Sequence, residues 1–136
     1  MRQIPKVIEM SISINYDPDQ NALYTNATGE ISLEDIMFYY SEIEQIDFKP
    51  QYSVLADYSE ANADLDLDDI ANMTSRRYGI SKGLGVIKIA VVAKSDLLFG
   101  LARMYQGMSD HKLFEVSAFR DRGEALRWLK IFDAPA

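Results

Sequence analysis

The segment from residue 57 to 69 holds six carboxylates and no lysine or arginine. Its Asp64-Leu65-Asp66-Leu67-Asp68 spacing resembles a calcium loop, in which alternate side-chain oxygens face one cation. An EF-hand also needs glycine at its sixth position and glutamate at its twelfth, where this chain has Asp69 and Ser75. We therefore interpret these carboxylates chiefly as charges that stabilise the positive end of a helix dipole, and we predict no metal site. A looser cation site, or an imitation of a phosphorylated serine, is the weaker alternative.

Classical catalytic patterns are missing from the chain. Its one histidine, His111, lies in a polar loop with no recognisable serine–histidine–acid set. Gly83-Leu84-Gly85 lacks the third glycine of a dinucleotide loop and precedes a strand rather than opening a helix. We therefore predict no catalytic residue, no cofactor and no enzymatic activity.

A binding site is predicted where buried strands end. Ligands of open α/β sheets bind beyond the carboxyl ends of the strands. Asp57-Tyr58-Ser59 follow one buried strand, and Lys94-Ser95 follow the next. A helix that starts at Ser95 also offers free backbone N–H groups, which favour an anion. We predict that these five residues bind a ligand or a partner. The alternative is that Ser95 only caps its helix and Lys94 is solvated.

Arg103 and Tyr105 are weaker candidates on the helix that follows Ser95. In the ordinary interpretation they belong to the core, with the arginine extending its charge to solvent. In the other, they form a wall of an amphiphilic pocket with Arg103 as the cation. If the strand-end site is wrong, the next candidate is the face that carries Tyr39, Tyr40 and Tyr105.

Alternating and helical apolar spacing gives the elements that would position these residues. The spacing predicts strands at residues 7–14, 22–28, 52–58, 87–93 and 113–119, and helices at 33–46, 67–79, 96–108 and 122–132. The order β-β-α-β-α-β-α-β-α predicts an α/β fold with a mixed sheet: an N-terminal hairpin, then parallel strands joined by right-handed helical crossovers.

Local signals refine these helices. Ser32, Asp66, Ser95 and Asp121 are predicted N-caps, because their side chains can accept from backbone N–H groups of the first turn. Ile70, Met73 and Tyr78 of the second helix are expected to face the core. In the third helix, the apolar residues between Leu97 and Met108 are expected to do the same. Trp128 and Phe132 are expected to dock the last helix.

Composition limits the classes of partner. The chain has 136 residues, 48% of them hydrophobic, which predicts one domain over residues 1–136. A net charge of −7 disfavours nucleic acid. No apolar run reaches eighteen residues, so no transmembrane segment is predicted. With no cysteine, and with an N-terminus typical of a strand rather than a signal peptide, we expect a cytoplasmic protein.

Several strings resemble the SpoIIAA-like family of the STAS and Sec14-like fold, especially its uncharacterised stand-alone bacterial members. They are Gly29-Glu30-Ile31-Ser32-Leu33-Glu34-Asp35, Val54-Leu55-Ala56-Asp57, Ala90-Val91-Val92-Ala93, Ala102-Arg103-Met104-Tyr105 and Phe119-Arg120-Asp121 with Ala125-Leu126-Arg127-Trp128-Leu129. The resemblance covers nearly the whole chain and implies the fold given above.

The resemblance also carries functional expectations. Classical members are anti-sigma-factor antagonists with a phosphorylated serine in an Asp-Ser-Ser-Gly motif. The equivalent stretch here is Asp64-Leu65-Asp66-Leu67-Asp68-Asp69, which lacks that serine. We expect a non-catalytic cytoplasmic binding or regulatory module with a protein or small-molecule partner. The alternative is a carrier or sensor of a small amphiphilic or lipid-like anion, by analogy with Sec14-like domains. The sequence leaves open whether the chain forms a homodimer.

Overall fold

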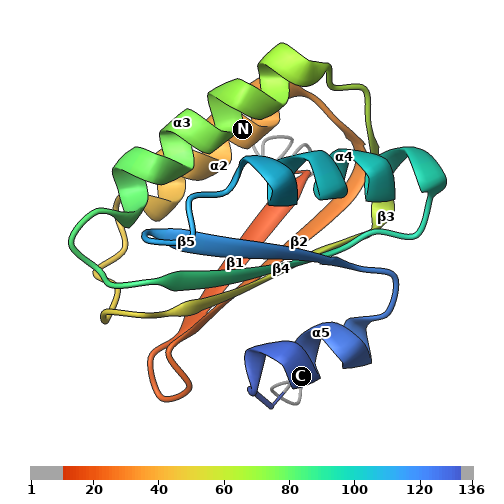
Figure 1. Ribbon diagram of the computed structural model, residues 1–136. Helices are drawn as coiled ribbons and strands as arrows, with labels where there is room; N and C mark the ends of the chain where they lie inside the picture. Colours follow the sequence, from red (N-terminus) through yellow and green to blue (C-terminus); the bar gives the residue numbers. More distant parts are fainter. Residues whose placement is uncertain (1–10, 133–136) are drawn as a thin grey trace, which may run out of the picture.

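The computed structural model describes residues 11–132, which form five strands and four helices (Figure 1). The strands are β1 (Ile12–Asp17), β2 (Ala22–Ile31), β3 (Ser53–Ala63), β4 (Ile87–Val92) and β5 (Phe114–Phe119). The helices are α2 (Leu33–Ile43), α3 (Leu67–Ser81), α4 (Asp96–Met108) and α5 (Arg122–Leu129). Within these residues the element order is the predicted one.

The strands form one mixed sheet in the order β1-β2-β3-β4-β5. β1 and β2 pair antiparallel as a hairpin, and the other neighbours pair parallel. β3 therefore lies at the centre, which agrees with the buried apolar run Val54-Leu55-Ala56 in its first half. The predicted fold class is confirmed.

α2, α3 and α4 cover one face of the sheet and α5 covers the other (Figure 1). From β2 to β5 the strands advance across the sheet in chain order. Right-handed crossovers in one direction place every connecting helix on the same face, so α2, α3 and α4 lie together. α5 follows the last strand and packs on the opposite face.

All four predicted N-caps are confirmed. Ser32 and Asp66 each form a complete capping box, with Asp35 and Asp69 respectively. Ser95 accepts from the backbone N–H of Leu98, and Asp121 from that of Glu124. Asp66 and Asp69 thus cap α3, and Asp68 and Asp69 lie in its first turn, the position at which the sequence predicted that carboxylates stabilise the helix dipole.

Apolar side chains fill both faces of the sheet. The larger core, under α2, α3 and α4, includes Val54 and Ile89. The smaller core, under α5, includes Leu55, Ala90 and Val92. Neighbouring residues of β3 and β4 thus enter opposite cores, as strand alternation requires.

Several predicted boundaries of strands and helices were wrong. β1 continues to Asp17, so the hairpin turn starts later than expected, and the predicted strand residues 7–10 lie outside the described residues. β2 and β3 extend to Ile31 and Ala63 because residues 28–31 and 60–63 continue to pair beyond an irregularity. α2 ends at Ile43, three residues before the expected end.

Three apolar side chains that were expected in the core are exposed. Tyr78 is 42% exposed because the buried row of α3 follows Ile70 and Arg77, which share a helix face seven residues apart. Leu97 lies at the edge of the buried row of α4. Phe132 is 85% exposed, since Lys130 adopts a left-handed conformation (φ 59°) that turns the chain away from α5.

Candidate functional site

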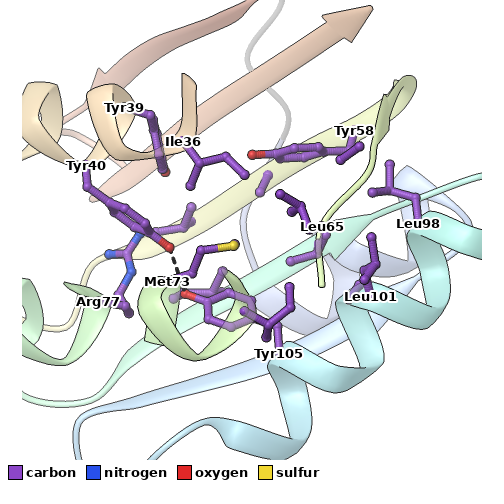
Figure 2. Close-up of a pocket in the computed structure, with 17 residues that line it drawn as sticks. Ile36, Tyr39, Tyr40, Tyr58, Leu65, Met73, Arg77, Leu98, Leu101 and Tyr105 are labelled. Carbon is purple, nitrogen blue, oxygen red and sulfur yellow. Dashed lines mark hydrogen bonds between the residues drawn. The ribbon is translucent and has the colours of Figure 1, made fainter. Parts of the chain in front are cut away.

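A cavity of about 60 Å³ lies between the sheet and α2, α3 and α4 (Figure 2). This is space for about four to six water molecules, at roughly 10–15 Å³ each. Its walls are mostly apolar side chains from both layers: Ile36, Val54, Ala56, Ala63, Leu65, Ile70, Met73, Ile89, Val91, Leu98, Leu101 and Ala102.

Small side chains help to keep this space open. Ala56 and Ala63 of β3 and Ala102 of α4 all line the cavity. Each presents only a methyl group where core positions more often hold larger apolar side chains. Protein interiors are usually packed without voids larger than a water molecule, so a cavity with this lining requires an explanation.

An irregularity in β3 brings Ala63 to the same cavity as Tyr58. Asn26 pairs with Asp57 and Thr28 with Glu60, so β3 has one extra residue at this point. Such bulges redirect side chains and are frequent near functional sites. Ala56 lines the cavity before the irregularity and Ala63 lines it after, although strict alternation would place them on opposite faces.

Arg77 is the most unusual residue of the cavity wall. It is only 2% exposed, although arginine is rarely buried without a paired charge. Its Nη1 donates to the Tyr52 hydroxyl at 3.0 Å, and its guanidinium carbon lies 5.5 Å from the ring centre of Tyr40. Its Nε has no hydrogen-bond partner. Among residues 11–132, no carboxylate forms an ion pair with it.

The guanidinium of Arg77 stays charged in this setting. Burial acts to lower its pKa, but the hydroxyls of Tyr105, Tyr52 and Tyr39 outweigh it, and the pKa lies above its ordinary value. Removing an ion from water costs several kcal/mol in real proteins, and close opposite charges normally offset that cost. At physiological pH the groups that contact Arg77 are a neutral hydroxyl and a ring face, so neither supplies an opposite charge.

Tyrosine hydroxyls supply the other polar groups of the wall. The Tyr40 and Tyr105 hydroxyls lie 3.4 Å apart, and the Tyr39 hydroxyl is 3.0 Å from that of Thr25. Burial raises the pKa of Tyr39, Tyr40 and Tyr58, so these groups are neutral at physiological pH. They can donate or accept hydrogen bonds but are poor bases.

The two ends of the cavity differ in polarity and exposure. Figure 2 shows Arg77 and Tyr40 at one end and Tyr58 and Leu98 at the other. Arg77 and Tyr40 are each 2% exposed, whereas Tyr58 and the neighbouring Leu65 are partly exposed. A molecule in the cavity would therefore meet the cation at the buried end and apolar side chains toward the surface.

The structure separates the residues of the predicted site. Tyr58 and Tyr105 line the cavity. All three residues of the alternative face, Tyr39, Tyr40 and Tyr105, line it as well. Two other predicted residues lie outside it. Lys94 is exposed, and Ser95 caps α4.

Asp57 and Ser59 belong to a different cluster. An oxygen of Asp57 accepts from both the backbone N–H and the hydroxyl of Ser59, and the other accepts from Arg122 Nη1 at 2.8 Å. Burial acts to raise the pKa of Asp57, but the bonds from Ser59 and Arg122 outweigh it and lower the pKa. Because Arg122 begins α5, this cluster ties α5 to β3.

Arg77, rather than Arg103, supplies the cation of the cavity. Arg103 is exposed and is not among the lining residues. A signal for Arg77 existed in the sequence: it follows Ile70 and Met73 at intervals of seven and four residues, which places it on their helix face. Arg77 was missed because Tyr78, the next residue, was assigned to that face instead.

The described residues show no sign of two other kinds of site. Residues 11–132 contain no group of three or more histidine, aspartate or glutamate side chains that could hold a metal ion. No helix among them is both long and apolar enough to cross a membrane.

Comparison with known proteins shows the fold. Neither a scan against protein-family models nor a search of curated proteins finds a match. Among solved structures, the chain is similar to an uncharacterised DUF3478-family protein with a SpoIIAA-like fold from Shewanella loihica PV-4. The TM-score is 0.57 at 22% identity, over 88% of this chain and 94% of the other. The chain therefore has a SpoIIAA-like fold, and the predicted resemblance is confirmed at that level.

Proposed function

We propose that this SpoIIAA-like chain is a non-catalytic binding module that holds a small, largely apolar ligand between its sheet and α2, α3 and α4. The observation that carries the proposal is the cavity lined by Ala56, Ala63 and Ala102. Pockets for small molecules are typically apolar with a few placed polar groups, and this wall has that composition.

The polar groups of the wall favour binding over catalysis. General acid–base chemistry needs a group whose pKa lies near the working pH. The pKa values of Tyr39, Tyr40 and Tyr58 are raised by burial, and Arg77 keeps its proton. These residues are suited to hold and orient a ligand. A regulatory role and a cytoplasmic location stay predictions.

Native mass spectrometry tests this function on the protein as purified. We expect the wild type to carry a small molecule that is released on denaturation. Ala102→Leu places a larger side chain in the cavity and should abolish this added mass, because overfilling removes the ligand's space. Ala71→Leu, an equal change at an exposed position of α3, should leave it unchanged.

An added mass that persists at full occupancy in Ala102→Leu would show that the ligand binds elsewhere. A wild type that carries no small molecule, and that also binds neither hexanoate nor its neutral analogue hexanamide, would contradict the proposed function.

A further inference from the structure

We propose that the ligand is a short-chain carboxylate, whose anionic end binds Arg77 at the buried end of the cavity while its apolar chain lies toward Tyr58. This inference rests on the proposed function and names the chemical class of the ligand. It starts from the incompletely partnered guanidinium described above.

Arg77 has unused capacity for hydrogen bonding. A guanidinium has five N–H donors in a planar fork that matches the two oxygens of a carboxylate. The contacts of Arg77 use Nη1 for Tyr52 and leave Nε without a partner. A buried donor without a partner is costly, so a ligand oxygen there would relieve an existing deficit rather than displace a protein contact.

The charge of the site requires an anion. Arg77 has no ion pair within residues 11–132, although the whole chain carries a net charge of −7. A carboxylate would supply the missing opposite charge in a setting of low dielectric, where charge-assisted hydrogen bonds are strongest.

The neighbouring hydroxyls suit the same group. The Tyr40 hydroxyl lies 3.4 Å from that of Tyr105, which is longer than the usual distance for a bond between two hydroxyls. Figure 2 shows both hydroxyls pointing into the space between α2 and α4. Each can turn its proton toward an anion bound beside Arg77.

Size and polarity define the remainder of the ligand. The cavity holds about 60 Å³ and is lined by apolar side chains such as Leu98 and Leu101 beyond the tyrosines. This volume suits a carboxylate and the first carbons of an aliphatic chain, and the rest of the chain would extend toward the partly exposed Tyr58 and Leu65. A second charged group on the ligand would have to lie among apolar side chains without a partner, which is unfavourable.

The test compares hexanoate with hexanamide, a neutral analogue of the same length and shape, by titration of the wild-type protein. We expect hexanoate to bind at least tenfold more tightly. Equal or tighter binding of hexanamide would overturn this inference and leave the proposed function standing. Binding of neither probe would overturn this inference, and it would overturn the proposed function as well if the purified wild type also carries no small molecule.

Variants then assign the charge to Arg77. Arg77→Met should weaken hexanoate binding at least tenfold and leave hexanamide binding unchanged. Arg77→Lys should recover only part of the loss, because a lysine lacks the planar fork. Arg103→Met removes an exposed arginine of α4 and should change neither affinity. Unchanged hexanoate affinity in Arg77→Met would overturn the proposal.

The melting temperature separates a binding role from a structural one. Replacing buried charges with apolar side chains of similar volume is often neutral or stabilising. Arg77→Met should therefore fold and keep its melting temperature. If it does not fold, the wild-type comparison of the two probes still decides the proposal, since it needs no variant.

Discussion

Arg77 illustrates how far a single residue departs from the normal composition of a protein core. Buried charges are usually paired, yet this guanidinium contacts a hydroxyl and a ring face. Arg76, the preceding residue, forms an ordinary surface ion pair with Glu44 at 2.6 Å. The sequence presents two adjacent arginines, and only their positions on the helix distinguish the surface residue from the buried one.

The candidate site was therefore only partly predictable from residue types. Tyr58 and Tyr105 were expected to bind and do line the cavity. Arg103 was a weaker candidate, named as the cation in the alternative interpretation of an amphiphilic pocket. Which arginine enters the cavity depends on how α3 and α4 rotate against the sheet, and apolar spacing fixes that rotation to no better than about one residue, or 100°.

Asp57 gives a pH-dependent prediction at the residue scale. Its pKa is lowered in the folded protein, so its stabilising effect is present above the unfolded-state pKa and is lost as the pH falls through the folded-state pKa. Asp57→Asn should lower the free energy of unfolding by about 1–2 kcal/mol at pH 7, with a discount for the partly exposed Arg122. In acid, where the wild-type carboxyl is protonated, the difference should shrink.

Urea unfolding of the wild type and of Asp57→Asn, from pH 7 into the acid range, measures this difference in the free energy of unfolding. A difference between them that stays constant from pH 7 down to the acid transition would show that the Asp57 charge does not stabilise the fold.

At the scale of elements, features that depend on neighbouring residues were predicted correctly, whereas an irregularity that depends on pairing between distant strands was not. The N-caps at Ser32 and Asp66 were predicted because each depends on contacts within one helical turn. The irregularity between β2 and β3 was not, because it depends on a partner strand more than thirty residues away. That irregularity brings Ala63 to the face of β3 that lines the cavity.

α5 gives a prediction about docking. Trp128 is partly buried, with its ring centre 5.7 Å from that of Phe119 and the Lys88 ammonium 4.4 Å from the Trp128 ring centre. Trp128→Ala should cost about 2–3 kcal/mol, less than the 3–5 kcal/mol of a fully buried tryptophan. Phe132→Ala, at an exposed aromatic residue, should cost less than about 0.5 kcal/mol.

Urea unfolding compares the two variants. Similar losses for Trp128→Ala and Phe132→Ala would mean that the tryptophan does not hold α5 against the sheet.

At the scale of the whole molecule, the fold follows from the order of its elements and the cavity does not. Strands that alternate with helices predict parallel pairing, and right-handed crossovers place α2, α3 and α4 on one face. The cavity arises because small side chains of β3 and α4 meet beneath those helices. Whether these side chains meet depends on packing between elements, which the spacing of apolar residues along the sequence does not predict.

The most direct test of the central claim, that this cavity binds a small ligand, is an NMR titration with hexanoate that follows side-chain methyl groups. We predict saturable shifts at Met73, Leu98 and Leu101, which line the cavity, and none at Leu126 and Leu129, which pack on the α5 face. Unchanged cavity methyl groups at saturating hexanoate, or shifts centred on Leu126 and Leu129, would contradict the account.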